Sequence, residues 1–464
     1  MAAKPLLRIL SLLVIATQCA NIAVAEDRPN ILLIITDQQS ATMMSCAGNA
    51  WLDTPAMDGL SVSGVRFEKA YAANPVCVPS RFSLLSGRYP TEIGMRYNQS
   101  RPLSGTERIV GEAAGHVLLR AGYETVYGGK VHLPGAMKKI EDCGFTNITD
   151  DQRDELAVVC ADYLSQKHDK PFFLLASFIN PHDICYMAIM AEGSTTRPGP
   201  QPIFGAMKLP DGVSEDDFYA TMCPPLPDNF EPSRGEPSAY DALLRQRAFR
   251  QHVRDEWTER DWRLHRYAYC RLTERVDAQI GIVMDALDES ENAQDTIVIF
   301  TSDHGDNDAA HRMEHKTTFY EEAARIPMII RDPRNGKQDV VDAEHLVSNG
   351  LDMLPTLCDY SGAELPAGLH GRSLRPLIDA NSTRKVEWRD AVLVENEVGD
   401  MVYDGRYKYC EFLEGEINVA LFDMQTDPGE MTNLAIDPTT EYAVIIARLK
   451  VRLEELRTER TLVE

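Results

Sequence analysis

The chain has 464 residues, of which 25% are charged and 44% hydrophobic, the composition of an ordinary globular protein with one large domain and a smaller one. Its formal net charge of −24 argues against nucleic-acid binding, which depends on attraction to phosphates, so we expect no nucleic-acid partner. Any anionic substrate would need a locally positive site in this acidic chain.

Residues 1–25 have the pattern of a secretory signal peptide. Lys4 and Arg8 precede a short apolar run, and small residues lead up to the expected cleavage point before Glu26. The run is too short to cross a bilayer, and no later segment is long enough, so we expect no transmembrane segment and a secreted or periplasmic protein. A lipoprotein anchor at Cys19 is the alternative, although the residues before Cys19 fit the required pattern poorly.

Apolar runs without polar–apolar alternation recur along the chain and are separated by helical patterns. Such runs are typical of strands that are buried on both faces of a mostly parallel sheet. The predicted fold class is therefore α/β, with a large, mostly parallel sheet flanked by helices. The predicted strands span residues 31–36, 172–178, 296–301 and 327–330, and the clearest helices span residues 58–64 and 267–287.

Ionisable residues follow three of these strands: Asp37 after the first, His182 after the second, and Asp303 with His304 after the third. Because ligands bind beyond the carboxyl ends of parallel strands, we expect these side chains to meet at one edge of the sheet. A buried carboxylate such as Asp37 needs a partner, and the candidates are a cation or the turn that it would cap. Oxygen ligands favour Ca²⁺ or Mg²⁺, and a histidine ligand favours Mn²⁺.

The most specific motif is Cys-Val-Pro-Ser-Arg at residues 77–81, followed by Leu-Ser-Gly-Arg at residues 85–88. Taken alone, Cys77 could also be a buried structural cysteine before a short helix. The ten cysteines form no C-x-x-C pair, so the sequence predicts no zinc site, and disulfide pairing in an exported protein stays open.

Basic residues gather in two further places, at Lys130 with His132 and in the segment 311–316. A lone Lys-x-His pair is more often surface charge. Together with Arg81, however, these residues would supply cations that neutralise an oxyanion. His182, at the end of a strand, has an ordinary pKa that suits a general acid.

Residues 188–248 are rich in proline and glycine and are predicted to form a long surface excursion, of the kind that often carries function. From about residue 391, four short strand patterns are followed by a helical pattern at 440–457, which predicts a small α+β subdomain. We therefore expect a catalytic domain at 26–370 and a C-terminal subdomain at 371–464. The excursion and this subdomain are where we expect specificity, with three loose candidate residues, His370, Arg372 and Arg406.

The motif at residues 77–88 resembles the signature of type I sulfatases, which belong to the alkaline phosphatase superfamily. Other segments resemble the same family in the same order. The resemblance covers nearly the whole mature chain and is weakest in the excursion. The matching segments are residues 31–37, 54–58, 64–67, 77–88, 128–132, 172–182, 302–316, 320–322 and 421–434.

The resemblance implies that Cys77 is oxidised to formylglycine by a formylglycine-forming enzyme and then hydrated to a gem-diol. One hydroxyl would attack the sulfur and displace the alcohol, and the other would later expel sulfate. The resemblance also implies a divalent cation, with Ca²⁺ expected and Mg²⁺ or Mn²⁺ as alternatives. The implied metal ligands are Asp37, Gln38, residue 77, Asp303 and His304.

Basic residues around the modified side chain also receive roles from the resemblance. Arg81 and Lys130 would hold the modified side chain, and Lys316 would clamp the sulfate. His132 would take the proton when sulfate leaves, and His182 would protonate the leaving alcohol.

Gln38 departs from the family pattern, which often has a second acid at this position. An amide oxygen can still bind a hard cation, but the site loses one negative charge, which weakens cation affinity and changes metal preference. Relatives that hydrolyse choline sulfate or phosphonate monoesters look similar here. Gln38 therefore keeps both the choice of metal and the class of ester open.

We expect a secreted sulfatase that acts on a sulfated carbohydrate or another small sulfate ester. The expected export favours a carbohydrate substrate over a small intracellular sulfate ester, because an extracellular enzyme meets sulfated polysaccharides. A phosphonate monoester or phosphodiester hydrolase on the same fold is the first alternative, since sulfuryl and phosphoryl centres are both tetrahedral. A non-catalytic carbohydrate-binding relative is the second alternative, and the complete set of motif residues argues against it.

Overall fold

The structure is a computed structural model that describes residues 28–100, 107–137, 139–193, 199–383 and 386–460. The expected signal peptide at residues 1–25 lies outside the described residues. Within the described part, no helix combines the length and the apolar character that a membrane crossing requires.

Eight strands form one large, mostly parallel sheet in the order β5-β4-β6-β1-β7-β8-β2-β9. Its central strand β1 (Asn30–Asp37) pairs in parallel with β6 (Phe172–Pro181) and with β7 (Thr296–Ser302). All three strands are buried along their whole length, which explains why their sequences do not alternate. The other strands are β2 (Val65–Phe67), β4 (Glu124–Gly129), β5 (Thr146–Thr149), β8 (Met328–Arg331), which is antiparallel to β7, and β9 (Val340–Asp342).

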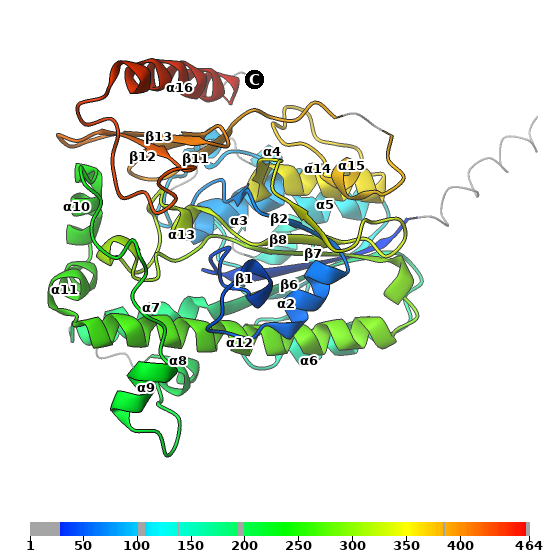
Figure 1. Ribbon diagram of the computed structural model, residues 1–464. Coiled ribbons are helices and arrows are strands. Elements are labelled where there is room, and N and C mark those ends of the chain that lie inside the picture. Colours follow the sequence, from blue (N-terminus) through cyan, green and yellow to red (C-terminus); the bar gives the residue numbers. More distant parts are fainter. Residues whose placement is uncertain (1–27, 101–106, 138, 194–198, 384–385, 461–464) are drawn as a thin grey trace, which may run out of the picture.

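Alternate residues of β1 point to opposite faces of the sheet and into two separate hydrophobic clusters. Ile31, Leu33 and Ile35 pack on one face, and Leu32 and Ile34 pack on the other. Helices cover both clusters, as Figure 1 shows. One face carries α3 (Cys77–Ser86), α5 (Ala114–Arg120) and α14 (Asn349–Ser361), and the other carries α2 (Pro55–Val62), α6 (Leu156–Leu164) and α12 (Glu259–Glu289). The predicted α/β fold class is confirmed.

Helix α12 begins before the predicted residue 267 because its start has a capping box. The Thr258 side chain accepts a hydrogen bond from the backbone N–H of Asp261, and the Asp261 carboxylate accepts one from the backbone N–H of Thr258. The polar first turns of α12 lack the apolar spacing by which the rest of the helix was predicted.

The described part of residues 188–248 contains several short helices joined by non-helical segments, which the sequence analysis did not predict; that the segment is a surface excursion stays a prediction. Prolines and glycines separate these helices rather than preventing them. In α10, for example, Ala239, Tyr240, Leu243 and Leu244 are buried at helical spacing. The helices are α7 (Cys185–Ala191), α8 (Gln201–Ala206), α9 (Glu215–Thr221) and α10 (Ser238–Arg245), and α11 (Ala248–Glu256) follows them.

The C-terminal part contains an antiparallel four-stranded sheet in the order β11-β12-β13-β14. Helix α16 (Thr440–Glu459) packs on it through Leu449, Leu453 and Leu456. This sheet lies within the predicted C-terminal subdomain at residues 371–464. The boundary between residues 370 and 371 itself stays a prediction. Its strands are β11 (Val392–Glu395), β12 (Gly399–Tyr403), β13 (Tyr407–Phe412) and β14 (Val419–Asp423).

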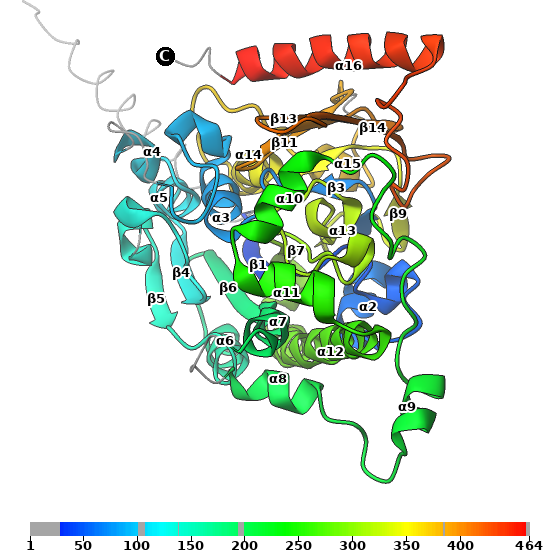
Figure 2. The same cartoon turned by 90° about the vertical axis from the view of Figure 1, so that its left-hand side faces the viewer.

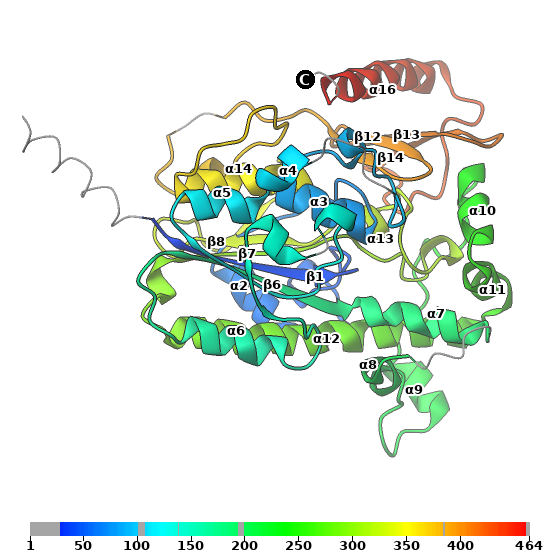
Figure 3. The same ribbon diagram turned by 180° about the vertical axis from the view of Figure 1, so that it is seen from behind.

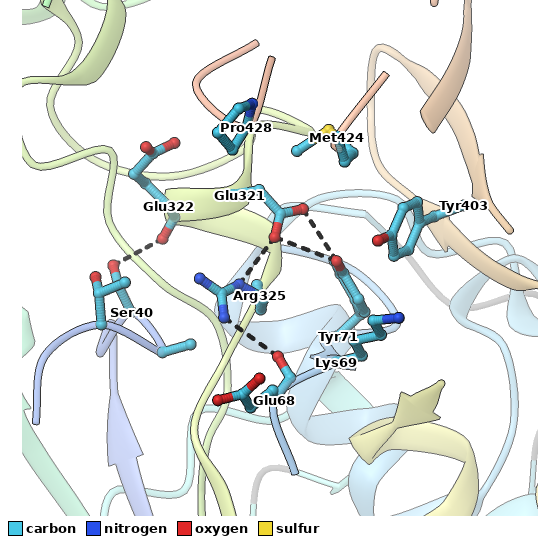
Figure 4. A pocket seen from close by; sticks show the side chains of 12 residues that line it. Ser40, Glu68, Lys69, Tyr71, Glu321, Glu322, Arg325, Tyr403, Met424 and Pro428 are labelled. Carbon is cyan, nitrogen blue, oxygen red and sulfur yellow. Dashed lines mark hydrogen bonds and ion pairs between the residues drawn. The ribbon is translucent and has the colours of Figure 1, made fainter. Parts of the chain in front are cut away.

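Lys408 on β13 joins the C-terminal sheet to α13 (Glu321–Ala324) through buried charges. Its Nζ lies 2.7 Å from the Glu321 carboxylate and 2.8 Å from the Glu430 carboxylate. Glu321 also accepts a hydrogen bond from the Tyr71 hydroxyl and pairs with Arg325 at the wall of a cavity of about 380 Å³ (Figure 4). Two carboxylates therefore share one fully buried cation, Lys408.

Replacing Lys408 by methionine should lower the free energy of unfolding by about 3–5 kcal/mol, because it leaves both buried glutamates without their shared cation. Urea denaturation at pH 7 would measure the loss. Lys450→Met, on the exposed side of α16, is the control and should change stability by under about 0.5 kcal/mol. A Lys408 variant as stable as the wild type would contradict this prediction.

Candidate active site

Parallel neighbouring strands deliver polar side chains to one end of the large sheet. Strands β1, β6 and β7 run to the same end (Figures 1 and 3). Asp37 is the last residue of β1, Lys130 follows β4, His182 follows β6 and Asp303 follows β7. Cys77, the first residue of α3, lies against this end and within hydrogen-bonding range of the residues that follow β7. The convergence expected from the strand ends is present.

Four buried residues offer ligand atoms that all lie within 4.8 Å of one another: Asp37, Cys77, Asp303 and His304. The His304 Nε2 lies 3.1 Å from the Cys77 Sγ. Its Nδ1–H donates to the Gly305 carbonyl, so the Nε2 lone pair faces the cluster. A Cβ at Gly305 would lie 1.9 Å from the Glu322 carbonyl oxygen, which explains the glycine after the Asp-His pair. Two carboxylates, an imidazole and residue 77 together suit a divalent cation.

The two carboxylates of this cluster differ in their electrostatic surroundings. Arg81 bridges them, with Nη2 at 2.8 Å from Asp37 and Nε at 2.8 Å from Asp303, and Lys130 Nζ lies 2.6 Å from Asp37. Burial raises the pKa of Asp37, but Lys130 and the other neighbouring cations hold it well below its usual range. Burial and the nearby Asp37 charge raise the pKa of Asp303 to about 6. His304 and Arg81 offset this rise only in part, and a divalent cation would further favour the charged carboxylate.

Cys77 lies where a negative charge is stabilised. Its Sγ is 2.9 Å from the Lys316 Nζ. It also begins α3, and the N-terminus of a helix favours an anion. Burial and Asp37 raise the pKa of the thiol, but Lys316, Lys130 and His304 outweigh them and hold it well below the ordinary value. The same surroundings would stabilise an oxyanion on a modified residue 77.

The amide of Gln38 has partners at both ends. Its Nε2 donates to Asp306 at 2.6 Å, and its Oε1 accepts a hydrogen bond from Lys316 at 3.0 Å. Because Asp306 holds the NH₂ end, the oxygen is turned toward Lys316. Asp306 was missed as a site residue, although it follows directly on the Asp-His-Gly motif and is fully buried.

The two histidines that were assigned proton transfers lie in different places. His182 Nε2 is 3.9 Å from an Asp37 oxygen, and its Nδ1 is 3.8 Å from the Cys185 Sγ. Burial, with Lys130 as the next cause, lowers the pKa of His182 to about 4, so this imidazole is neutral at neutral pH. His132 is exposed and has a positive φ of 42°. Among the described residues, none forms a hydrogen bond or ion pair with its side chain.

Comparison with known proteins identifies the family. A sequence profile described as Sulfatase matches residues 29–363, which is more than half of the chain. The chain belongs to the sulfatase family. A profile described as N-sulphoglucosamine sulphohydrolase, C-terminal, matches residues 309–459 of this sulfatase. It is therefore an enzyme of the sulfuric ester hydrolase class.

Several proteins similar to this sulfatase are named as sulfatases of sulfated sugars. It is 32% identical over 463 residues to a Delta 4,5-hexuronate-2-O-sulfatase of Bacteroides thetaiotaomicron, covering 95% of this chain and 91% of the relative. An N-acetylglucosamine-6-O-sulfatase of the same organism is 25% identical, with 95% and 88% covered. The solved structure of a 2-O GAG sulfatase matches with a TM-score of 0.77 and 29% identity, covering 94% of this chain and 93% of that one.

The turn that carries Lys316 in this sulfatase has an unusual backbone. Asn307 pins it, because its backbone N–H and its side-chain amide both donate to the His315 carbonyl. Positive φ at non-glycine residues costs free energy and tends to occur where function requires a fixed geometry. Six such residues, with φ between 46° and 88°, lie in this turn: Asp308, Ala309, His311, Arg312, His315 and Thr317.

The loose specificity candidates lie apart from the cluster in this sulfatase. Arg406 pairs with Asp423 at 2.8 Å within the C-terminal sheet. His370 packs on the ring of Tyr89 at 5.5 Å. Among the described residues, no hydrogen bond or ion pair joins His370, Arg372 or Arg406 to the residues around Cys77.

Proposed function

We propose that this sulfatase is exported and hydrolyses a sulfate ester on a carbohydrate, using a formylglycine made from Cys77 and a divalent cation. The observation that carries the proposal is the position of Cys77, whose sulfur lies 2.9 Å from Lys316 and 3.1 Å from His304 in a buried, charged cluster. The sugar sulfatases among its relatives support a carbohydrate substrate. Export rests on the pattern of residues 1–25.

The residues of the cluster fit a divalent cation. Asp37, Asp303, His304 and the modified residue 77 would hold it, with Ca²⁺ expected from the carboxylates and Mg²⁺ or Mn²⁺ as alternatives. When bound, the cation supplies Lewis-acid polarisation of the sulfuryl oxygens. Gln38 is the ligand with the weakest support, because its oxygen already accepts a hydrogen bond from Lys316.

The cations of the site have separate tasks. Arg81 is fixed by two carboxylates and by Ser177, so it can hold residue 77 and its neighbours in place. Lys130 and Lys316 are buried beside the cluster; Lys130 would hold the modified side chain and its oxyanion with Arg81, and Lys316 would neutralise the charge of the sulfate group. Three cations against two carboxylates make the site locally positive in a chain with a net charge of −24.

Proton transfer to the leaving alcohol is assigned to His182, which lies on the open side of the cluster with one-fifth of its side chain exposed. The negative charge of a bound sulfate ester favours the protonated imidazole and would raise its pKa from the low value of the free enzyme. His132, two residues after Lys130 in the chain, is proposed to take the proton when sulfate leaves.

The first test is the mass of the tryptic peptide of residues 70–81 from protein made in a host with a formylglycine-forming enzyme. We expect a peptide lightened by the exchange of a thiol-bearing methylene for an aldehyde, and reactive toward a hydrazide. An unmodified Cys77, in a host that modifies a control sulfatase, would refute the proposal that Cys77 becomes formylglycine.

Matched aryl esters test the reaction itself. We expect sulfate release from an aryl sulfate to be faster than phosphate or phosphonate release from the corresponding esters under the same conditions. Faster release of the phosphonate ester would favour the phosphonate monoester hydrolase alternative. A modified protein that hydrolyses none of these esters, nor any sulfated sugar, would contradict the proposed enzyme.

A further inference from the structure

Helix α11 places Arg250 beside the turn that carries Lys316. The helix lies beyond the end of the sheet at which the cluster is built (Figures 1 and 2). The ring of Phe249 packs on the ring of His315, with 5.1 Å between the centroids. His315 is the chain neighbour of Lys316, whose Nζ touches the Cys77 sulfur. Arg250 is the chain neighbour of Phe249. One aromatic contact therefore links α11 to the proposed sulfate-binding lysine.

Arg250 forms no close ion pair among the described residues, and the carboxylate that acts on it, Glu397, lies beyond ion-pairing distance. Its Nε is buried and has no hydrogen-bond partner, and no described residue forms an ion pair with its guanidinium. Nearby arginines differ: Arg254 pairs with Glu236 at 2.7 Å, and Arg266 pairs with Asp308 at 3.1 Å. The chain has 71 acidic residues against 47 basic ones, so an unpaired arginine is not explained by a shortage of carboxylates.

Arg250 is half-buried, and its Nε is fully buried without a hydrogen-bond partner, which is costly for a cation. Burial lowers the pKa of Arg250 to about 10, and Glu397 on the neighbouring loop offsets only part of that effect. Arg250 also acts on the same ring as the sulfate-binding lysine: burial, followed by Arg250 and Lys316, holds the pKa of His315 well below its usual range. A bound anion would relieve this unfavourable arrangement.

We propose that Arg250 binds the carboxylate of the sugar that carries the sulfate ester, so that the substrate is a sulfated uronate. The inference rests on the proposed function. A guanidinium is planar and binds a carboxylate through two parallel hydrogen bonds, which makes arginine more suitable than lysine for this task. In this arrangement Lys316 and the cluster bind the sulfate, and Arg250 binds the second anionic group. Specificity then resides in α11, directly after the predicted excursion.

Substrate modification tests the proposal without any change to the protein. A 2-O-sulfated uronate disaccharide and its carboxyl methyl ester differ in one negative charge. We expect the wild type to hydrolyse the free acid with a kcat/KM about 10- to 100-fold higher than the ester, the range of a charge-assisted hydrogen bond. The difference should fall mainly in KM. Equal rates on the two substrates would overturn the proposal.

The variant Arg250→Gln should lower kcat/KM on the free acid by the same factor and should lose most of the discrimination between acid and ester. Arg250→Lys should recover part of it. Arg245→Gln is the matched control, because Arg245 is exposed on α10 and should leave both rates unchanged. Thermal unfolding of each variant shows whether it is folded.

The remaining outcomes separate this inference from the proposed function. A folded Arg250→Gln variant could lose as much activity on the methyl ester and on an aryl sulfate as on the free acid. Arg250 would then support the active site in general, and the proposed uronate substrate would be overturned. Arg250→Gln could instead lose activity mainly on a substrate with a second sulfate, such as a disulfated amino sugar without a carboxylate. That result would also overturn the proposed uronate substrate. Both results leave sulfate hydrolysis standing, whereas a wild type inactive on every sulfate ester refutes the function itself.

Discussion

Replacing Cys77 by alanine should reduce kcat/KM for sulfate esters by at least about 10⁴-fold, because it removes the side chain that is proposed to become the nucleophile. The cations around residue 77 would remain, but they stabilise a charge that no longer forms. Wild-type protein from a host without a formylglycine-forming enzyme should be impaired to a similar degree, since its thiol is intact and unmodified. Steady-state kinetics on an aryl sulfate and on a sulfated sugar would measure both effects.

A second buried cysteine provides the control for this change. Cys160 is fully buried in α6, far along the chain from the cluster, and Cys160→Ala also removes one buried thiol. It should cost about 1–2 kcal/mol of stability and leave kcat within about twofold. If Cys77→Ala kept a tenth or more of the wild-type kcat/KM in a folded protein, residue 77 would not be the nucleophile.

The architecture of the site was predictable where short-range sequence patterns determine it. The runs at residues 31–36, 172–178 and 296–301 became three parallel, buried neighbours, and the rule for strand ends brought Asp37 together with Asp303. No further information is needed for that step, because a run that is apolar on both faces must lie inside a covered sheet.

The geometry within the site depends on contacts that no local pattern contains. Arg81 pairs with Asp303 across 222 residues of sequence, and Asp306 orients the amide of Gln38 across 268 residues. The helices within residues 188–248 were missed for a different reason. Proline and glycine are strong local signals, and they outweighed the weaker helical spacing of Tyr240 and Leu243. Arg250 carried no signal at all, since an arginine without a partner is visible only when its surroundings are known.

Removing one carboxylate from the cluster should abolish both its response to a divalent cation and most of its activity. In the wild type, adding Ca²⁺ after treatment with EDTA should raise the melting temperature by a few degrees, because a ligand at about 100 times its Kd stabilises the folded state by about 2.7 kcal/mol. Asp37→Asn should show little or no such shift, and its kcat/KM should fall by about 10³-fold or more. Asp352→Asn is the control. Asp352 lies in α14 and is a fully buried carboxylate that pairs with Arg389, so its loss should lower stability but leave the response to Ca²⁺ unchanged.

The stabilisation by Ca²⁺ should also depend on pH, and Asp303 gives the sign. Its pKa in the folded protein is raised to about 6 from an ordinary value of 3.8, so the folded state binds more protons than the unfolded state between these values. Stability due to Asp303 is therefore present below pH 4 and is lost as the pH rises through 6, where the buried carboxylate becomes charged. A cation compensates that charge above pH 6 but must displace a proton below it. The melting-temperature shift on adding Ca²⁺ should be larger at pH 7.5 than at pH 5, and a shift that is equal at both values, or equal in Asp37→Asn and the wild type, would place the cation outside this cluster.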